Sequence, residues 1–364
     1  DIIGTAIGTT NLVDNQLLIT MIFLGLGIGP LFFGPLSDAL GRKPVVYLGF
    51  VIAVIASFIC VYAQSLEVMI AGRILQGIGL SAPRTIAIAI IRDRYSGDYM
   101  ARIMSFVTVV FLLIPIIAPA LGKQVLDHYD WQSIFHVQVI ISVLVSLWFW
   151  RRQPETLADE HRVRFSNKLI YAGFREVLRH RHTMGYTIIS GFIVGSFLVY
   201  LSSSQQIFQL QYGLVDEFPY IFAGLAVAIG SAIFLNGSVV VKLGMERLVT
   251  WALIGFFIIS LIYVVLFFNA ENPPVLVLLA FFAMQFFAIG FLFGNLRALA
   301  MEPLGHIAGI AAAITGFIST IMAVPISTFI GRFVTESALP IFVGFLICGT
   351  ISVAYLFFLK KSKS

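Results

Sequence analysis

Charged residues are scarce in this sequence: only 11% of its 364 residues are Asp, Glu, Lys or Arg, against about 25% in an ordinary soluble domain. Apolar side chains make up 59%. A chain of this length could fold a large soluble core, but it has too little polar surface to cover one. We therefore expect an integral membrane protein whose apolar helices face lipid.

Several kinds of chemistry lack the residues they need. Cys60 and Cys348 lie in apolar segments far apart, which supports neither a disulfide framework nor a metal cluster. The sequence has no G-x-x-x-x-G-K-[ST] loop, which argues against an ATP-driven pump. It has no nucleophile elbow and no His/Cys/carboxylate cluster, so we expect neither an enzyme nor a metal site. The net charge of +5 does not indicate nucleic-acid binding, because the basic residues lie in short loops beside apolar segments.

What the sequence does have is a series of long apolar segments. Most of them could cross a hydrocarbon layer of ~30 Å as helices rising 1.5 Å per residue. A window of about 19 residues places eleven of them, at 17–36, 45–63, 68–90, 103–122, 134–150, 184–207, 219–240, 248–268, 275–298, 307–330 and 339–359.

Lys and Arg are concentrated in every second connection. One set of connections carries Arg42, Lys43, Arg92, Arg94, Arg102, the basic residues of 151–181, Lys242, Arg247, Lys360, Lys361 and Lys363; the other carries only Lys123 and Arg332. Because Lys and Arg favour cytoplasmic loops, we expect the first set, the central loop and the C-terminus to be cytoplasmic, and residue 1 to be outside.

The chain contains an internal repeat. The pattern Phe33-Gly34-x6-Gly41 recurs as Asn236-Gly237-x6-Gly244, an offset of 203 residues, and in both copies a basic turn joins two helices. Applied to the segment 184–207, this offset lands almost wholly before residue 1, so we expect a further helix upstream and two bundles of six. The expected domains are an N-terminal bundle (1–150, helices 2 to 6), a cytoplasmic linker (151–183) with an amphipathic part at 167–178, and a C-terminal bundle (184–364, helices 7 to 12).

Several short motifs lie at the ends of these segments. GPLSDALGRKP, residues 34–44, resembles the major facilitator superfamily motif G-x-L-x-D-R-x-G-R-[RK] between helices 2 and 3. AGRILQGIGLSAPR (71–84) resembles the helix 4 motif, and LLIPIIAPALG (112–122) is similar to the antiporter motif of helix 5. PETL (154–157) and YLSSSQQIFQLQYGL (200–214) resemble the bicyclomycin and chloramphenicol resistance branch of the drug/proton antiporters.

This resemblance implies an all-α integral membrane protein of the major facilitator fold, with two pseudo-symmetric six-helix bundles. It implies a secondary active transporter that exports amphipathic small molecules, drugs among them, across the bacterial inner membrane by proton antiport and alternating access. The expected partners are the small-molecule substrate, protons and membrane lipid. We expect no cofactor, the proton gradient being the energy source, and a monomer. The resemblance also implies an acidic coupling residue on helix 1.

The charged turn is a candidate conformational latch, formed by Gly34, Asp38, Gly41, Arg42 and Lys43. Asp38 at a helix end can pair with Arg42 and with neighbouring helix termini, and such a pair would break when the cytoplasmic side opens. Ala39 replaces the basic residue that the family has after the aspartate, which removes one contact. The alternative is that Arg42 and Lys43 only set the topology. We expect the two glycines to serve close packing and the tight turn.

Arg73 and Arg84 are the candidate cavity residues of the helix at 68–90. They are eleven residues apart, which at ~100° per residue brings them within ~20° of the same direction, and Gln76 lies beside that stripe. Charge inside a membrane is costly and usually functional, so we expect this stripe to line a central cavity. The alternative, strongest for Arg84, is that the side chain extends to a membrane surface.

Other candidates come from three more helices. Pro115, Pro119 and Gly122 form the helix 5 antiporter-like motif, although Ile114, Ala118 and Lys123 replace three of its glycines; a seal between the halves and a simple kink are both open. Tyr200, Ser203 and Gln206 on helix 7, with Gln285 on helix 10, are candidates for hydrogen bonds to substrate. Helix packing through small polar residues is the alternative.

The substrate stays open at this level. No Asp or Glu lies in the middle of an apolar segment, so the predicted cavity leans positive. Export of an anionic metabolite or siderophore is therefore an alternative to drug efflux. A non-coupled facilitator and a transporter-like receptor are further alternatives.

Overall fold

The computed structural model describes residues 2–9, 12–95, 97–162, 166–268 and 272–361, and within these ranges it contains helices and no strands. The long helices are α2 (Leu12–Leu40), α3 (Arg42–Val61), α4 (Leu66–Arg94), α5 (Gly97–His128), α6 (Gln132–Arg152), α8 (Arg181–Gln205), α9 (Phe218–Leu243), α10 (Met245–Phe267), α11 (Val275–Met301), α12 (Ala308–Gly331) and α13 (Leu339–Lys361). The short ones are α1 (Ile2–Ala6), η1 (Asp159–His161), α7 (Asn167–Arg179), the π-helical η2 (Gln206–Gln211) and η3 (Glu302–Ile307).

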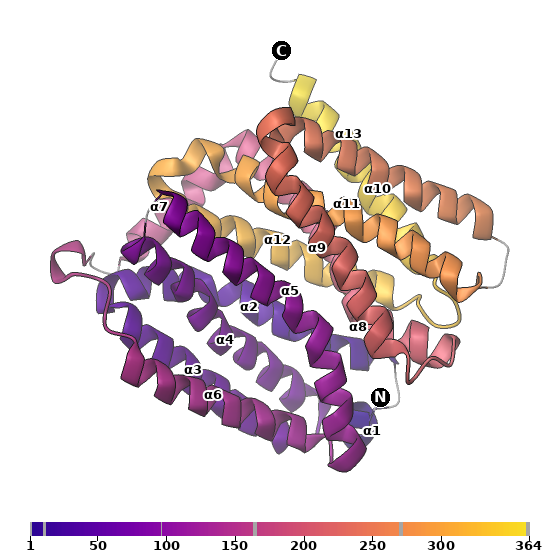
Figure 1. Ribbon diagram of the computed structural model, residues 1–364, viewed down its shortest axis with the longest axis horizontal. Helices are drawn as coiled ribbons and strands as arrows, with labels where there is room; N and C mark the ends of the chain where they lie inside the picture. Colours follow the sequence, from indigo (N-terminus) through magenta and orange to yellow (C-terminus); the bar gives the residue numbers. More distant parts are fainter. Residues whose placement is uncertain (1, 10–11, 96, 163–165, 269–271, 362–364) are drawn as a thin grey trace. The chain divides into compact units, whose positions relative to one another are not determined.

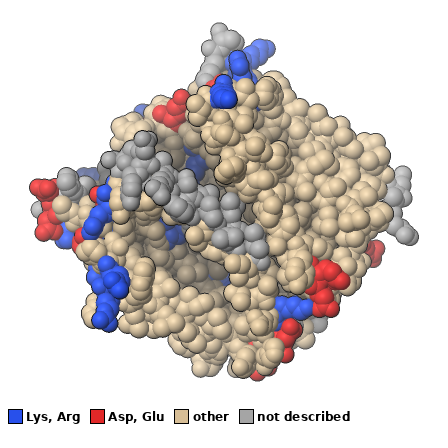
Figure 2. Space-filling view, viewed as in Figure 1, with Lys and Arg blue, Asp and Glu red and all other residues tan. Residues whose placement is uncertain are grey.

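The eleven predicted apolar segments all coincide with long helices, which confirms the all-α membrane fold. Within the described residues, nine stretches are long and apolar enough to cross a membrane, and one of them, Val275–Gly331, contains both α11 and α12. In Figure 2 the charged side chains are grouped in a few places, and broad areas carry none. Such surfaces suit contact with lipid.

The chain divides into two compact units. The first consists of Asp1–Phe111 and Ala120–Phe174, and the second of Leu112–Pro119 and Arg175–Ser364. The main boundary falls inside the predicted linker, 151–183. The amphipathic part of that linker forms α7, as the sequence predicts.

Close backbone approach holds the first unit together. Its helices α2 and α4 pack along each other, as do α3 and α4 and also α3 and α6 (Figure 1). A Cβ built on Gly77 would lie 2.1 Å from the carbonyl oxygen of Ile22, and one built on Gly25 would lie 2.1 Å from that of Ile74. Because lipid provides no hydrophobic driving force between helices, small residues that let backbones meet are the expected device.

Aromatic side chains fill the core of the second unit. Tyr263 of α10 stacks on Phe342 of α13 with ring centroids 3.7 Å apart. Tyr200 of α8 meets Phe286 of α11 edge to face at 4.5 Å. Such pairs add specific geometry to the dispersion energy that holds the helices.

The internal repeat is visible in the backbone. Gly41, between α2 and α3, has φ 102° and ψ 158°, and Gly244, between α9 and α10, has φ 81° and ψ 149°. Both occupy the position just before a helix and adopt a conformation that suits glycine. The offset of 203 residues therefore relates two turns of the same geometry.

Candidate functional site

The first candidate site is a charged cluster where α2 ends and α3 begins. We call it the Arg42 cluster, and it consists of Ser37, Asp38, Arg42, Asp93, Glu155 and Thr156. These residues come from α2, α3, the last turn of α4 and the segment that follows α6. All of them belong to the first unit.

Arg42 is the centre of the cluster. Its side chain is only 4% exposed and forms an ion pair with Asp38, one turn earlier in the chain. Its Nε donates to Oδ2 of Asp93 at 2.9 Å, and its Nη1 donates to the hydroxyl of Ser37 at 2.8 Å. A buried charge is tolerated only when it is paired and hydrogen-bonded in this way.

Glu155 caps the N-terminus of α3. Its carboxylate accepts hydrogen bonds from the backbone amides of Arg42 and Lys43, at 3.0 and 2.9 Å, and from those of Thr156 and Leu157, at 2.9 and 3.0 Å. Partial burial raises the pKa of Glu155, but these amide hydrogen bonds outweigh it and hold the pKa below its ordinary value. The residue thus supplies the acceptor that the first turn of a helix lacks.

Gly41 and Lys43 fit around this cap. A Cβ on Gly41 would lie 2.7 Å from Oε2 of Glu155, so a larger residue would disturb the carboxylate as well as the backbone. Lys43 donates from Nζ to the carbonyl oxygen of Trp150, near the end of α6, at 2.9 Å. Thr156 in turn donates to Asp93 at 3.2 Å.

These contacts decide part of what the sequence left open. The predicted pairing of Asp38 with Arg42 is confirmed. Arg42 is buried among three partners, which a residue that only sets topology does not require, and its role as a latch stays a prediction. The tight-turn role of Gly41 is confirmed by its positive φ. At Gly34 a Cβ would meet no described atom within 4 Å, so its part in close packing stays a prediction.

The second candidate site is centred on Arg73 of α4. Its guanidinium lies 4.9 Å from the ring centroid of Phe135 on α6 and donates to Oε1 of Gln76 at 3.1 Å. Among the described residues its buried Nε has no hydrogen-bond partner. The amide of Gln76 donates to Ser57 of α3 at 2.9 Å and to Gln138 of α6 at 2.8 Å.

This network differs from a simple cavity wall. Gln76 is 1% exposed, and its amide group joins α3, α4 and α6 inside the first unit. Arg73 is half-buried, whereas Arg84, eleven residues further on, is exposed. The stripe therefore runs from a packed end to an open one, and its role as a substrate cavity stays a prediction.

The polar run on α8 divides into two groups. Ser202 and Ser204 donate to carbonyl oxygens of their own helix, which fits the packing alternative. The hydroxyls of Tyr200 and Ser203 are buried and have no hydrogen-bond partner among the described residues. Buried polar groups without partners are uncommon and need an explanation. Substrate binding is one such explanation.

The remaining candidates have the following places. Gln206 donates to the carbonyl oxygen of Val334, and Gln285 donates to Ser260 and to the carbonyl oxygen of Phe256 on α10, so both amides make contacts inside the second unit. Pro119 and Gly122 lie within α5; the side chain of Pro115 lies outside the described residues. In the part of the chain that the structure describes, no group of three His, Cys, Asp or Glu residues could hold a metal ion.

Comparison with known proteins places the chain in a family. The family model described as "Major Facilitator Superfamily" matches residues 3–324. The chain belongs to the major facilitator superfamily. The family membership predicted from the charged turn and the other motifs is therefore confirmed. The members of this family are membrane transporters.

The individual relatives share only about a quarter of their residues with this chain. A bicyclomycin resistance protein homolog of Haemophilus influenzae is 27% identical over 95% of this chain and 87% of its own length. The multidrug resistance protein MdtL of Salmonella paratyphi A is 25% identical over 93% of this chain and 84% of its own length. A structure of the xylose transporter XylE from E. coli covers 97% of this chain and 89% of its own, with a TM-score of 0.72 at 14% identity. That last likeness concerns the fold alone.

Several residues that the geometry brings into these sites could not be assigned from the sequence, among them Asp93, Glu155, Ser57 and Gln138. Asp93 lies at the end of an apolar segment and Glu155 lies within PETL, and neither position by itself indicates a contact with the start of the helix at Arg42. For Gln138, a polar residue in the middle of an apolar segment was the available signal.

Proposed function

We propose that this transporter exports amphipathic small molecules, drugs among them, across the bacterial inner membrane in exchange for protons. The observation that carries the proposal is the likeness to relatives named for bicyclomycin and multidrug resistance, which extends over more than 90% of the chain. Their low identity leaves the particular substrate open, and bicyclomycin is the first compound to try.

Arg73 supports a role for the first unit in substrate or proton handling. It is a cation within an apolar helix, held by an aromatic ring and an amide, and no carboxylate is recorded as its partner among the described residues. Ionisable groups in this position commonly mark substrate or proton pathways. A proton arriving nearby, or an anionic group of the substrate, would change the electrostatic energy of this guanidinium.

The Arg42 cluster supports alternating access. Its ion pairs and the Glu155 cap join α2, α3, α4 and the segment after α6 through contacts that can form or break as a set. A switch between two arrangements needs such an element, with distinct contacts in each state. In the proposed cycle, two six-helix bundles rock about a central site, and the cluster stabilises one of the two states.

The proposed orientation rests on the basic turns. Arg42, Lys43, the central loop and the C-terminal lysines would face the cytoplasm, as the positive-inside rule predicts. In this orientation the Arg42 cluster lies at the cytoplasmic end of its helices. The proton gradient is the proposed energy source, and the proposed working form is a monomer.

Export of an anionic metabolite is the second candidate. It is favoured by the Arg73 and Arg84 stripe and by the lack of Asp and Glu in the middle of the described helices. An anion exporter should lose affinity when Arg84→Gln removes the exposed cation, whereas an exporter of neutral drugs should not. A non-coupled facilitator would move substrate without a proton gradient.

Drug accumulation in cells tests the proposal. Cells that lack their own drug exporters should become less susceptible to bicyclomycin when they produce this protein, and they should accumulate less of it. Collapse of the proton gradient should restore accumulation. If the protein reaches the membrane but neither bicyclomycin nor a panel of other drugs accumulates less, the drug-export proposal is wrong and anionic metabolites are tested next.

A further inference from the structure

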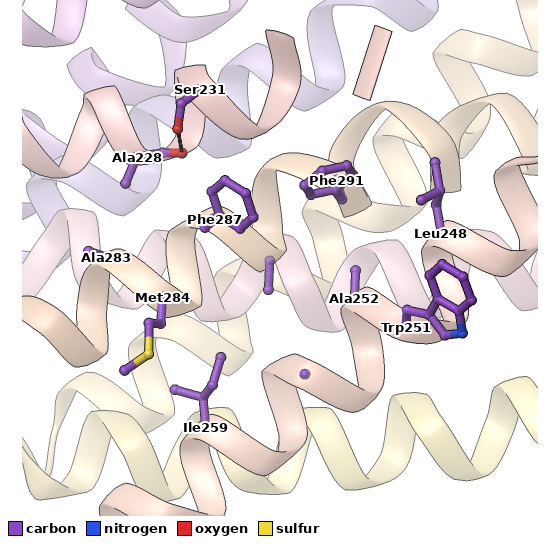
Figure 3. Close-up of a pocket in the computed structure, with 12 residues that line it drawn as sticks. Ala228, Ser231, Leu248, Trp251, Ala252, Ile259, Ala283, Met284, Phe287 and Phe291 are labelled. Carbon is purple, nitrogen blue, oxygen red and sulfur yellow. Dashed lines mark hydrogen bonds between the residues drawn. The ribbon is translucent and has the colours of Figure 1, made fainter. Parts of the chain in front are cut away.

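An apolar groove lies on the second unit, between α9, α10 and α11. α9 and α10 each pack extensively on α11 but contact each other little. A gap therefore remains between α9 and α10, and α11 forms its floor. The gap encloses about 580 Å³. Figure 3 shows Ala228 on α9, Trp251 and Ile259 on α10, and Met284 and Phe287 on α11 around it.

The groove opens onto a surface that is apolar on both sides. Val227 of α9 is 58% exposed, and Ile262 and Val265 of α10 are 45% and 70% exposed. In a membrane protein such side chains face hydrocarbon. The occupant must therefore be apolar along its length and must reach the groove from the bilayer.

The length of the groove suits one leaflet. Its lining on α10 runs from Leu248 to Ile259, a separation of eleven helical steps or roughly 16 Å. That is about half of the ~30 Å hydrocarbon core. An extended acyl chain that starts at one membrane surface fits this depth.

Two cations lie at one end of the groove. Arg247 is one helical turn before Trp251, on the same face of α10. Lys242 follows the groove residue Ser231 on α9 by eleven residues, which returns it to within ~20° of the same direction. Both side chains are exposed, and the structure records no ion pair for either among the residues it describes. The neighbouring acid, Glu246, bonds to Tyr186 of α8 instead.

Trp251 lies near the same end of the groove as Arg247. Its side chain is 58% exposed and lies beside Leu248 at the basic end of the groove (Figure 3). Tryptophan prefers the boundary between hydrocarbon and headgroups, where its ring is apolar and its N–H is polar. The groove thus has an apolar body, an aromatic residue at the membrane interface and a positive end. These parts match, in order, the acyl chain, the glycerol region and the phosphate of an anionic phospholipid.

We propose that this groove binds an anionic phospholipid, with one acyl chain along α11 and the headgroup phosphate against Lys242 and Arg247. The proposal requires only that the second unit spans a lipid bilayer, and it does not depend on which substrate the protein exports. Basic sites between membrane helices are known to suit anionic headgroups. Bound there, the lipid fills the gap between α9 and α10 and stabilises their spacing.

Quenching by brominated lipid tests the proposal. The purified protein is placed in liposomes that contain brominated phosphatidylglycerol or brominated phosphatidylcholine. The difference between wild type and Trp251→Phe gives the fluorescence of Trp251. Trp148→Phe is the matched control, because Trp148 of α6 is 65% exposed and lies outside the groove.

The expected result is selective quenching at Trp251. Each basic residue near an anionic lipid contributes about a factor of five. Brominated phosphatidylglycerol should therefore quench Trp251 at a mole fraction roughly 5- to 30-fold lower than brominated phosphatidylcholine, with no such preference at Trp148. The double change Lys242→Ala and Arg247→Ala should abolish the preference. Equal quenching by the two lipids, or a preference that survives the double change, would overturn the proposal.

A second variant tests the acyl chain. Gly255 lines the groove and a Cβ there meets no described atom within 4 Å, so Gly255→Leu places its side chain in the groove space. It should keep the wild-type Tm in phosphatidylcholine and lose the preference for phosphatidylglycerol. Gly237→Leu is the control, since Gly237 also faces open space but lies about 240° around α9 from Ser231. Retained preference in Gly255→Leu would contradict an acyl chain in the groove.

Two other occupants are separated by the same assay. If bicyclomycin displaces the brominated lipid from Trp251, the groove is a drug site and the lipid proposal is wrong. If quenching of Trp251 falls as the protein-to-lipid ratio rises, a second copy of the chain covers the groove. Quenching of Trp251 that changes neither with bicyclomycin nor with the protein-to-lipid ratio supports the lipid proposal.

Discussion

Glu155 and Arg42 are 113 residues apart in the chain, yet the Glu155 carboxylate accepts the backbone N–H of Arg42 at 3.0 Å. This contact ties the segment after α6 to the first turn of α3. The Arg42 side chain meanwhile binds Asp38 and Asp93. Arg42 thus joins the cap of α3, through its backbone N–H, to an ion-pair cluster, through its side chain.

Removal of the cap should destabilise the protein. Glu155→Ala leaves the first amides of α3 without an acceptor, and loss of a helix cap costs about 0.5–2 kcal/mol. We expect a lower Tm for the purified protein in detergent. Glu160→Ala is the control, because Glu160 is exposed in the same linker. Equal Tm values for the two variants would show that the cap carries no stability.

The cap should also depend on pH. The folded protein holds the pKa of Glu155 below the ordinary 4.5, so the charged form contributes stability above about 4.5, and this is lost as the pH falls through the lower, folded pKa. Glu155→Gln has no charge to titrate. The Tm difference between wild type and Glu155→Gln should be full near neutral pH and shrink in acid. A difference that stays constant down to the acid limit of folding would contradict this account.

Arg42 should matter more than a topology charge would. Arg42→Met leaves the Asp93 side chain, which is only 15% exposed, without its cation. We expect a loss of about 2 kcal/mol, less than for a fully buried pair because Asp38 is partly solvated. Adding Asp93→Asn should recover part of that loss. Thermal unfolding of the single and double variants measures the coupling, and purely additive effects would exclude it.

Much of the fold could be predicted because hydrophobicity determines it. Long apolar segments must form helices in a bilayer, where every backbone amide needs a partner within the segment. The repeat of Gly41 and Gly244 was visible because glycine is needed for the positive φ before each helix. Helix ends were less well placed: α2 runs from Leu12 to Leu40, beyond the expected 17–36, because polar residues continue the hydrogen-bonding ladder outside the apolar core.

The sites were harder to predict because they depend on distant contacts. Nothing local to Glu155 indicates that it reaches α3. Nor does the stripe on α4 show that Gln76 bonds to Ser57 and Gln138 in two other helices. The π-helical turn at Gln206–Gln211 has no periodic pattern that would separate it from an α-helix.

Arg73 should be needed for transport and not for folding. Arg73→Ala removes a cation that makes a cation–π contact and one hydrogen bond. If a charged hydrogen bond of this kind stabilises the transition state of transport, its loss lowers the transport rate about 10- to 100-fold. We expect transport to fall at least tenfold while the amount of protein in the membrane is unchanged. Arg92→Ala, at the exposed end of the same helix, is the control. Normal transport by Arg73→Ala would remove this residue from the site.

Tyr200 separates substrate binding from packing. Its hydroxyl has no partner among the described residues, so Tyr200→Phe should leave the Tm unchanged or raise it slightly. If the hydroxyl binds substrate, the KM for export should rise about tenfold. Ser202→Ala is the control, because that hydroxyl bonds within its own helix. A lower Tm with unchanged KM would favour packing.

Proton flux in liposomes tests the central claim most directly. The protein is reconstituted with a pH-sensitive dye inside, and bicyclomycin is added while proton movement and drug uptake are followed together. The account predicts a saturable proton flux that needs the drug, is absent from empty liposomes and falls in Arg73→Ala. Saturable drug movement with no proton flux would contradict antiport and leave a facilitator.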